Sequence, residues 1–249
     1  MMKQTLSSFH LKYICVSMMI VGEVLRQFVY QFTIGSGVEP LLWQTLLYHV
    51  GYFLYLGAFP IAGFLLVEGA KKTSNKRNFL RRLFSAGLLV ELPIDIAIHG
   101  FEASDYWGYQ LNYFFTLFLS LCVICLAEKI AEWLTAGSFW YNLITILIYL
   151  ASAVLAMLFQ MEQGGLGVLV ILALYVFYEN KVASLISVIV LYLLFFKGVG
   201  VFAVIPALSL LFLWLYKGEE GKKTVLSRMC FYFAYPVVFV IIEACMKFL

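Results

Sequence analysis

Long apolar segments alternate with short polar ones along most of the chain. An α-helix needs about 20 apolar residues to cross the hydrocarbon core of a bilayer, and most of these segments approach that length. The polar segments carry charged and turn-forming residues and are too short to form a soluble domain. The pattern predicts nine spans, at residues 11–32, 48–69, 79–98, 111–126, 140–160, 165–178, 182–196, 199–216 and 230–246.

The sixth and seventh spans are short for a full crossing, and they are divided only by Glu179, Asn180 and Lys181. If these two segments formed one helix, the C-terminus would lie on the opposite side of the membrane. We treat them as separate spans.

Composition agrees with this pattern. Of the 249 residues, 63% are hydrophobic and only 12% are charged, whereas a soluble domain carries about 25% charged residues. A soluble monomer is therefore excluded. We predict an all-α, polytopic transmembrane helix bundle of about nine spans in which residues 1–249 form one membrane-embedded domain. The net charge of +3 gives no reason to expect a nucleic-acid partner.

The positions of the basic residues predict the orientation. If the N-terminus lies in the cytoplasm, 14 of the 17 lysines and arginines fall on the cytoplasmic side, as the positive-inside rule requires. We therefore expect a multi-pass protein of the cell membrane, in contact with membrane lipid and with a cytoplasmic N-terminus.

Ionisable residues within the spans mark the candidate reactive site, because each charge in hydrocarbon costs about 2.5–3.5 kcal/mol on insertion scales. Glu91 and Asp95 lie four residues apart on one helical face, so one of the two is expected to hold a proton, as a general acid or a proton relay would. His99 lies about one turn beyond Asp95, where a carboxylate could orient its imidazole. Glu23 either pairs with Arg26 structurally or lines a reaction cavity. We predict that Glu91, Asp95, Glu23 and His99 are the catalytic residues, and we expect no metal site.

A strongly basic loop separates the second and third spans. Its sequence, KKTSNKRNFLRR, places six cations in twelve residues. Such a loop either contacts anionic lipid and sets the topology or holds the phosphates of a carrier such as coenzyme A. For the second case we expect the binding residues to be Lys71, Lys72, Asn75, Lys76, Arg77, Arg81 and Arg82.

Residues 59–95, which contain this loop, resemble the TraX family, which is named for a conjugal pilin N-acetylase. The shared pattern reads as F-P, then F-L-L-V-E-G, a basic T-x-N loop, R-L and an E-x-P-x-D ending. Weaker similarity continues through Asn112 and reaches Pro236. The matching positions of the main block are Phe59, Pro60, Phe64, Leu65, Leu66, Val67, Glu68, Gly69, Thr73, Asn75, Arg82, Leu83, Glu91, Pro93 and Asp95.

The resemblance implies a membrane acyltransferase that takes acetyl from acetyl-CoA and passes it to an amine of a peptide or protein. The chain departs from the family pattern at three places. Gly22 and Glu23 stand where relatives have an Asp-His pair, Val238 replaces a histidine, and Glu162 begins a segment that relatives start with Asp-Tyr-Gly.

Two hypotheses for function follow, and a third is weaker. Either the carboxylates or His99 replace the missing histidines and the protein is an acetyl-CoA-dependent N-acetyltransferase, or it is a catalytically inactive TraX-like interaction or assembly factor. A small transporter using Glu91 and Asp95 as a proton relay has suitable residues, but the spans show no inverted repeat.

Overall fold

The computed structural model describes residues 5–29, 39, 41–99, 110–135, 137–196, 200–221, 233–234, 236–238, 240–241 and 244. The described chain is helical, and its only β-type pairings are two isolated bridges. Contacts divide it into two compact units. Unit 1 comprises Met1–Ala62, Pro93–Phe101 and Val199–Leu249, and unit 2 comprises Gly63–Leu92 and Glu102–Gly198.

Unit 1 is built around α1 (Ser8–Val29), the first two thirds of α2 (Leu42–Lys72) and the 3₁₀ helix η3 (Gly200–Leu215). The segment before α1 pairs with the end of η3, where the backbone N–H of Leu6 donates to Leu215 O at 2.8 Å. In the middle of α1, the buried thiol of Cys15 donates to the backbone carbonyl of Ala58 in α2 at 3.3 Å. The segment before α1 is therefore bonded to η3, and α1 itself is bonded to α2.

Helices α1 and α2 approach each other closely at two glycines, Gly22 in α1 and Gly51 in α2. A Cβ atom added to Gly22 would lie 2.6 Å from Tyr55 N and 2.7 Å from Gly51 O, and one added to Gly51 would lie 2.8 Å from Gly22 O. Helices in membranes often associate through such small residues, because close backbone contact replaces the hydrophobic driving force that lipid removes. Gly22 is thus explained by packing.

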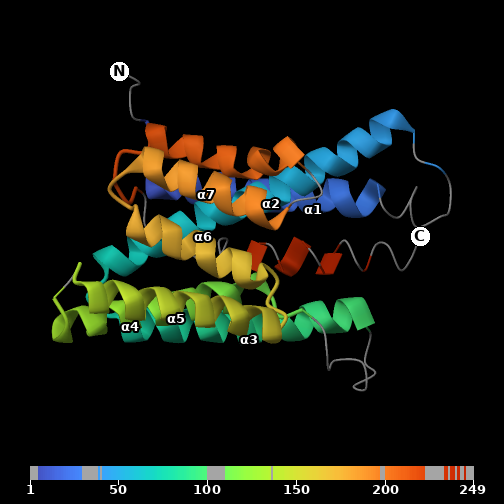
Figure 1. Cartoon of the computed structure of the whole chain (residues 1–249). Helices are drawn as coiled ribbons and strands as arrows, with labels where there is room; N and C mark the ends of the chain where they lie inside the picture. The colour runs from blue at the N-terminus through green and yellow to red at the C-terminus, as the bar shows by residue number, and fades with distance from the viewer. Residues whose placement is uncertain are drawn as a thin grey trace. The chain divides into compact units, whose positions relative to one another are not determined.

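Unit 2 contains the end of α2, most of α3 (Lys76–His99), α4 (Tyr113–Trp133), α5 (Phe139–Leu158), α6 (Gly164–Val176) and α7 (Lys181–Phe195). Helix α6 packs against α4, α5 and α7 (Figure 1). Its side chains at Val168, Val170, Ile171 and Leu174 are completely buried. The short α6 therefore forms the core of this unit.

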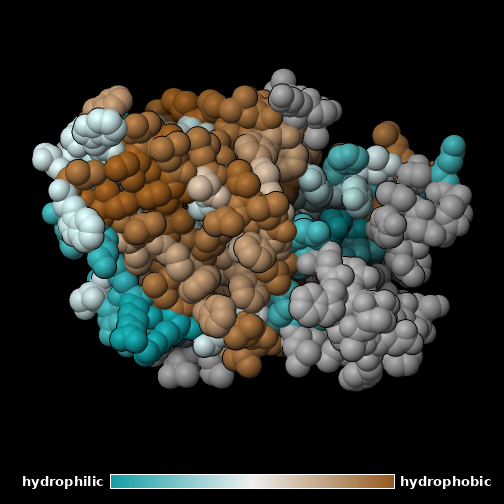
Figure 2. All heavy atoms as spheres, turned by 60° about the horizontal axis from the view of Figure 1, so that its bottom comes forward, coloured by the Kyte–Doolittle hydropathy of each residue, from teal (hydrophilic) through white to brown (hydrophobic). Residues whose placement is uncertain are grey.

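Helix α5 is apolar on its outer face and carries small or polar residues on its inner face. Its buried residues are Thr145, Ser152, Ala153 and Ala156, whereas Ile146, Leu150, Val154 and other large apolar residues are exposed. Figure 2 shows brown, hydrophobic side chains over a broad area of one face of the molecule. This distribution is the reverse of that in a soluble helix and is expected of a helix that contacts lipid.

Four described helices are long and apolar enough to cross a membrane, namely α1, α2, α4 and α5. They coincide with the first, second, fourth and fifth predicted spans, and they indicate a membrane protein. The N-terminal orientation stays a prediction.

The prediction of about nine spans is not confirmed. The sixth and seventh segments do form separate helices, with Asn180 capping α7 through a bond from Ala183 N. However, α6 has 13 residues and α7 has 15, so at 1.5 Å per residue they are only about 20 Å and 22 Å long, less than the roughly 30 Å hydrocarbon core. Most of the ninth segment lies outside the described residues.

Candidate functional site

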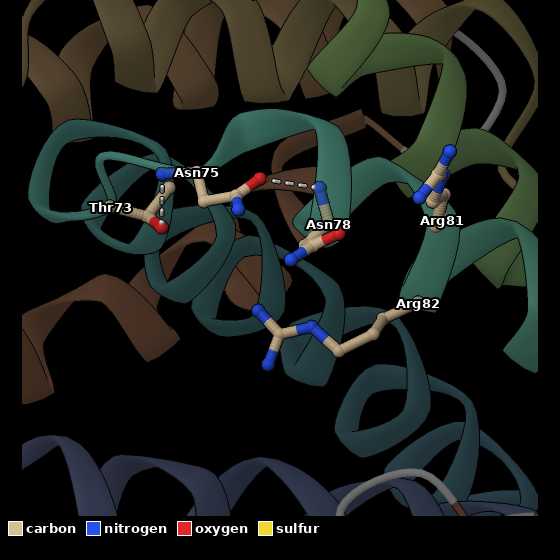
Figure 3. Close-up of a pocket in the computed structure, with 5 residues that line it drawn as sticks. All are labelled: Thr73, Asn75, Asn78, Arg81 and Arg82. Atoms are coloured by element: carbon tan, nitrogen blue, oxygen red, sulfur yellow. Dashed lines mark hydrogen bonds between the residues drawn. The ribbon is translucent and has the colours of Figure 1, made fainter.

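The turn between α2 and α3 is held by its own polar side chains. Helix α2 ends at Lys72 and α3 begins at Lys76. The side-chain oxygen of Asn75 accepts a hydrogen bond from Asn78 N at 3.0 Å, and the hydroxyl of Thr73 accepts one from Asn75 N at 3.3 Å (Figure 3). Asn75 therefore acts as the N-cap of α3 and satisfies one of the backbone N–H groups that a helix start leaves unpaired. The turn is a preorganised structure.

An open pocket of about 380 Å³ lies at this turn and is lined by five polar or charged residues, Thr73, Asn75, Asn78, Arg81 and Arg82. Figure 3 shows the guanidinium group of Arg82 extending below the turn, on the side to which the Asn78 amide also points, while Arg81 projects in another direction. The lining residues comprise two arginines, one hydroxyl and two amides, and the Arg82 guanidinium and the Asn78 amide share one side. Such a donor-rich set suits an anionic ligand with several oxygen atoms, such as a phosphate group.

The structure separates the six cations of the loop into two groups. Three lysines are engaged by other side chains of unit 2. Lys72 pairs with Glu68 at 2.7 Å, Lys76 pairs with Glu128 of α4, and the ammonium of Lys71 lies 4.8 Å and 5.0 Å from the ring centroids of Tyr175 and Tyr178.

Arg81 and Arg82 line the pocket, whereas Arg77 is exposed and is not among the lining residues. Of the seven binding residues predicted from the sequence, Asn75, Arg81 and Arg82 are thus found at the pocket. Asn78 was not predicted. Its position three residues after an N-cap asparagine places it on the first turn of α3, and this spacing is the signal that could have revealed it.

A polar network beside the turn connects α3, α4 and α6. Glu128 contacts Lys76 with one carboxylate oxygen and accepts a hydrogen bond from the hydroxyl of Tyr175 at 3.3 Å with the other. Just beyond α6, burial raises the pKa of Tyr178, and the nearby charges of Glu68 and Glu179 raise it further. Tyr178 is therefore neutral at physiological pH, and Lys71 contacts an uncharged ring.

The predicted catalytic residue Glu91 lies on α3 and contacts the start of α4. Its Oε2 accepts hydrogen bonds from the backbone N–H of Asn112 at 3.0 Å and from the side-chain amide of the same residue. Asn112 also donates to Gly87 O at 2.9 Å, and its own oxygen accepts from Phe114 N at 3.0 Å. Glu162 accepts from Tyr113 N at 2.8 Å. The backbone N–H groups of Asn112, Tyr113 and Phe114 thus donate to the side chains of Glu91, Glu162 and Asn112, in that order. Two of these acceptors are carboxylates, which the positive end of the helix dipole stabilises.

Glu23 is only 1% exposed and lies in unit 1. Its carboxylate is 2.8 Å from the guanidinium of Arg26 and also accepts a hydrogen bond from the amide of Gln27, at 2.8 Å. The pairing with Arg26 that the sequence allowed is present. Arg26 also lies over the ring of Tyr55 at 5.6 Å, so the charged group is enclosed by its own neighbours.

The remaining predicted catalytic residues, Asp95 and His99, lie on the last part of α3 in unit 1. Asp95 is half-buried, and the side chain of His99 is outside the described residues. Since Glu91 belongs to unit 2 and the other three belong to unit 1, a shared catalytic cavity stays a prediction.

In the comparison with protein families, the chain matches the model described as TraX protein over residues 7–245. Comparison with curated proteins and with solved structures gives no match. The matched segment includes the turn, its pocket and all the carboxylates described above. The chain belongs to the TraX family.

Proposed function

We propose that this protein is a membrane-embedded, acetyl-CoA-dependent N-acetyltransferase that modifies an amine of a peptide or protein. The observation that carries the proposal is the pocket at the α2–α3 turn, with Arg81 and Arg82 in its lining. One guanidinium group can bind two phosphate oxygens at once. The phosphates of coenzyme A are the anionic part of the acetyl donor.

The reaction requires a proton acceptor. The nitrogen of the acceptor amine attacks the thioester carbonyl, the C–N bond forms, and the C–S bond breaks to release coenzyme A as a thiolate that then takes up a proton. The amine loses its proton to a carboxylate, for which Glu91 and Asp95 are the proposed acceptors, with Glu23 and His99 as the other candidates. Glu91 lies nine residues beyond Arg82, or about 14 Å along α3. The long arm of coenzyme A would therefore run along α3 from the pocket.

Binding of acetyl-CoA to the purified protein in nanodiscs tests the pocket. Charge-assisted hydrogen bonds contribute about 1.5–3 kcal/mol each, so Arg82→Gln should weaken binding at least tenfold, by about 1.4 kcal/mol or more. Arg81→Gln should weaken binding less, because the Arg81 side chain lines the pocket but projects in another direction (Figure 3). Arg77→Gln is the matched control, because it removes the same charge from an exposed position of the same helix that does not line the pocket. Absence of binding, or an equal loss in the Arg77 variant, would contradict the proposal.

A non-catalytic membrane interaction or assembly factor is the second candidate. Two observations favour it. First, Gly22 and Glu23 replace the family's Asp-His pair, and here Gly22 allows close helix packing while Glu23 forms an ion pair. Second, Glu91 accepts a hydrogen bond at the start of α4. Mass spectrometry of surface and secreted peptides from cells with and without the gene separates the candidates, since an acetyl group that disappears with the gene excludes an inactive factor.

A further inference from the structure

The side chain of Arg82 rests on an aromatic ring of its own helix. Phe79 precedes Arg82 by three residues, which places the two side chains on the same face of α3. The Cζ atom of Arg82 lies 5.5 Å from the centroid of the Phe79 ring, within the range of a cation–π interaction. An exposed arginine otherwise samples many rotamers, so the ring restricts the directions that the guanidinium group can take.

The ring of Phe79 is itself fixed by a glycine near the end of α2. A Cβ atom added to Gly69 would lie 3.1 Å from Cε1 and 3.2 Å from Cζ of Phe79, closer than ordinary van der Waals contact. The ring therefore packs against bare backbone, where a larger residue would push it outward. Gly69 O also accepts a hydrogen bond from Thr73 N at 3.0 Å, so the same residue anchors the turn.

From these contacts we infer that Phe79, packed on Gly69, is a positioning residue that holds the guanidinium group of Arg82 toward the pocket and thereby raises affinity for a phosphate-bearing acyl donor. This inference rests on the proposed function, because it assumes that the pocket binds phosphate. It adds a residue that touches no ligand itself and acts through Arg82. The aromatic face, rather than bulk alone, is the property that Phe79 must supply.

The test measures dissociation constants for acetyl-CoA with the full chain in nanodiscs. Phe79→Leu keeps an apolar side chain against Gly69 and removes the ring. It should weaken binding about two- to fivefold, the effect expected of one exposed cation–π contact. Phe79→Tyr retains the ring face and should bind like the unmodified protein. Phe84→Leu is the control, since Phe84 lies on the same helix and its ring packs against Phe115 and Phe118.

A double-mutant cycle distinguishes positioning from general packing. In an Arg82→Met background, Phe79→Leu should cause no further loss, because the group that it orients is gone. An equal loss in both backgrounds, an equal loss in Phe84→Leu, or no loss in Phe79→Leu would overturn the inference while leaving the pocket intact. If Arg82→Met itself leaves acetyl-CoA affinity unchanged, the proposed phosphate pocket fails, and the inference fails with it.

Discussion

Substitution of Gly22 by alanine should destabilise the protein by disrupting the contact between α1 and α2. The added Cβ would lie 2.6 Å from Tyr55 N and 2.7 Å from Gly51 O. Both neighbours are backbone atoms of a helix and cannot rotate away. Since ordinary contact begins at roughly 3.4 Å, the two helices would have to separate by about 0.8 Å at their crossing.

Overpacking of this kind costs about 1–3 kcal/mol. For a chain of this size, 1 kcal/mol corresponds to about 2–4 °C in Tm, so Gly22→Ala should lower Tm by roughly 2–12 °C. The protein is heated in detergent to a series of temperatures, and size-exclusion chromatography then measures the fraction that remains monodisperse at each temperature. Alanine favours a helix over glycine by about 0.8–1.0 kcal/mol, so any measured loss understates the steric cost.

Gly57→Ala is the matched control in the same helix bundle. Its added Cβ would meet the terminal methyl of Met18 at 3.0 Å and Pro206 O at 3.4 Å. Because a methionine side chain can move aside, this variant should be neutral or slightly stabilising. A Gly22→Ala protein as stable as the unmodified one, or an equal loss in Gly57→Ala, would refute the close contact of α1 and α2.

Three further predictions concern unit 2. Glu128→Gln should lower stability by up to about 1 kcal/mol, because its ion pair is partly exposed, while Glu132→Gln, one turn further along α4, should have no effect on Tm. Asn112→Ala should lower the free energy of unfolding by about 2–3 kcal/mol, because it removes an N-cap and two donated hydrogen bonds. Asn180→Ala removes only an N-cap and should lower it by roughly 1 kcal/mol. A denaturant titration measures both values. The pKa of Tyr178 is raised in the folded state, so the contribution of its neutral form to stability is present below about pH 10 and is lost as pH rises through the folded pKa. Tyr178→Phe should therefore reduce the fall of Tm at high pH. An unchanged dependence of Tm on pH would contradict this.

The sequence was most informative where the signal was local. The apolar segments of α1, α2, α4 and α5 are long enough to be recognised by length alone, and Asn180 marks the break before α7. Glu68 and Lys72 are four residues apart, a spacing at which opposite charges on a helix meet, and they form an ion pair. The strongly basic loop predicts Arg81 and Arg82 among the binding residues, and both line the pocket, while ligand binding there stays a prediction.

The sequence was less informative where partners are distant in the chain. The basic loop predicts that Lys76 binds a ligand, and the structure pairs Lys76 with Glu128, 52 residues away. Glu91 was considered with its helical neighbour Asp95, whereas the structure shows its bonds to Asn112, 21 residues away. No periodic pattern reports such contacts, because they depend on how helices pack in space.

Transfer of labelled acetyl from acetyl-CoA to a peptide amine tests the central claim most directly. Membranes containing the protein would be incubated with isotope-labelled acetyl-CoA and a mixture of membrane and secreted peptides, and the label would be located by mass spectrometry. We predict labelled amines with the unmodified protein and with Arg77→Glu, and a strong reduction with the Arg81→Glu, Arg82→Glu double variant. Equal labelling with all three proteins and with membranes lacking the protein would contradict acetyl transfer at this site.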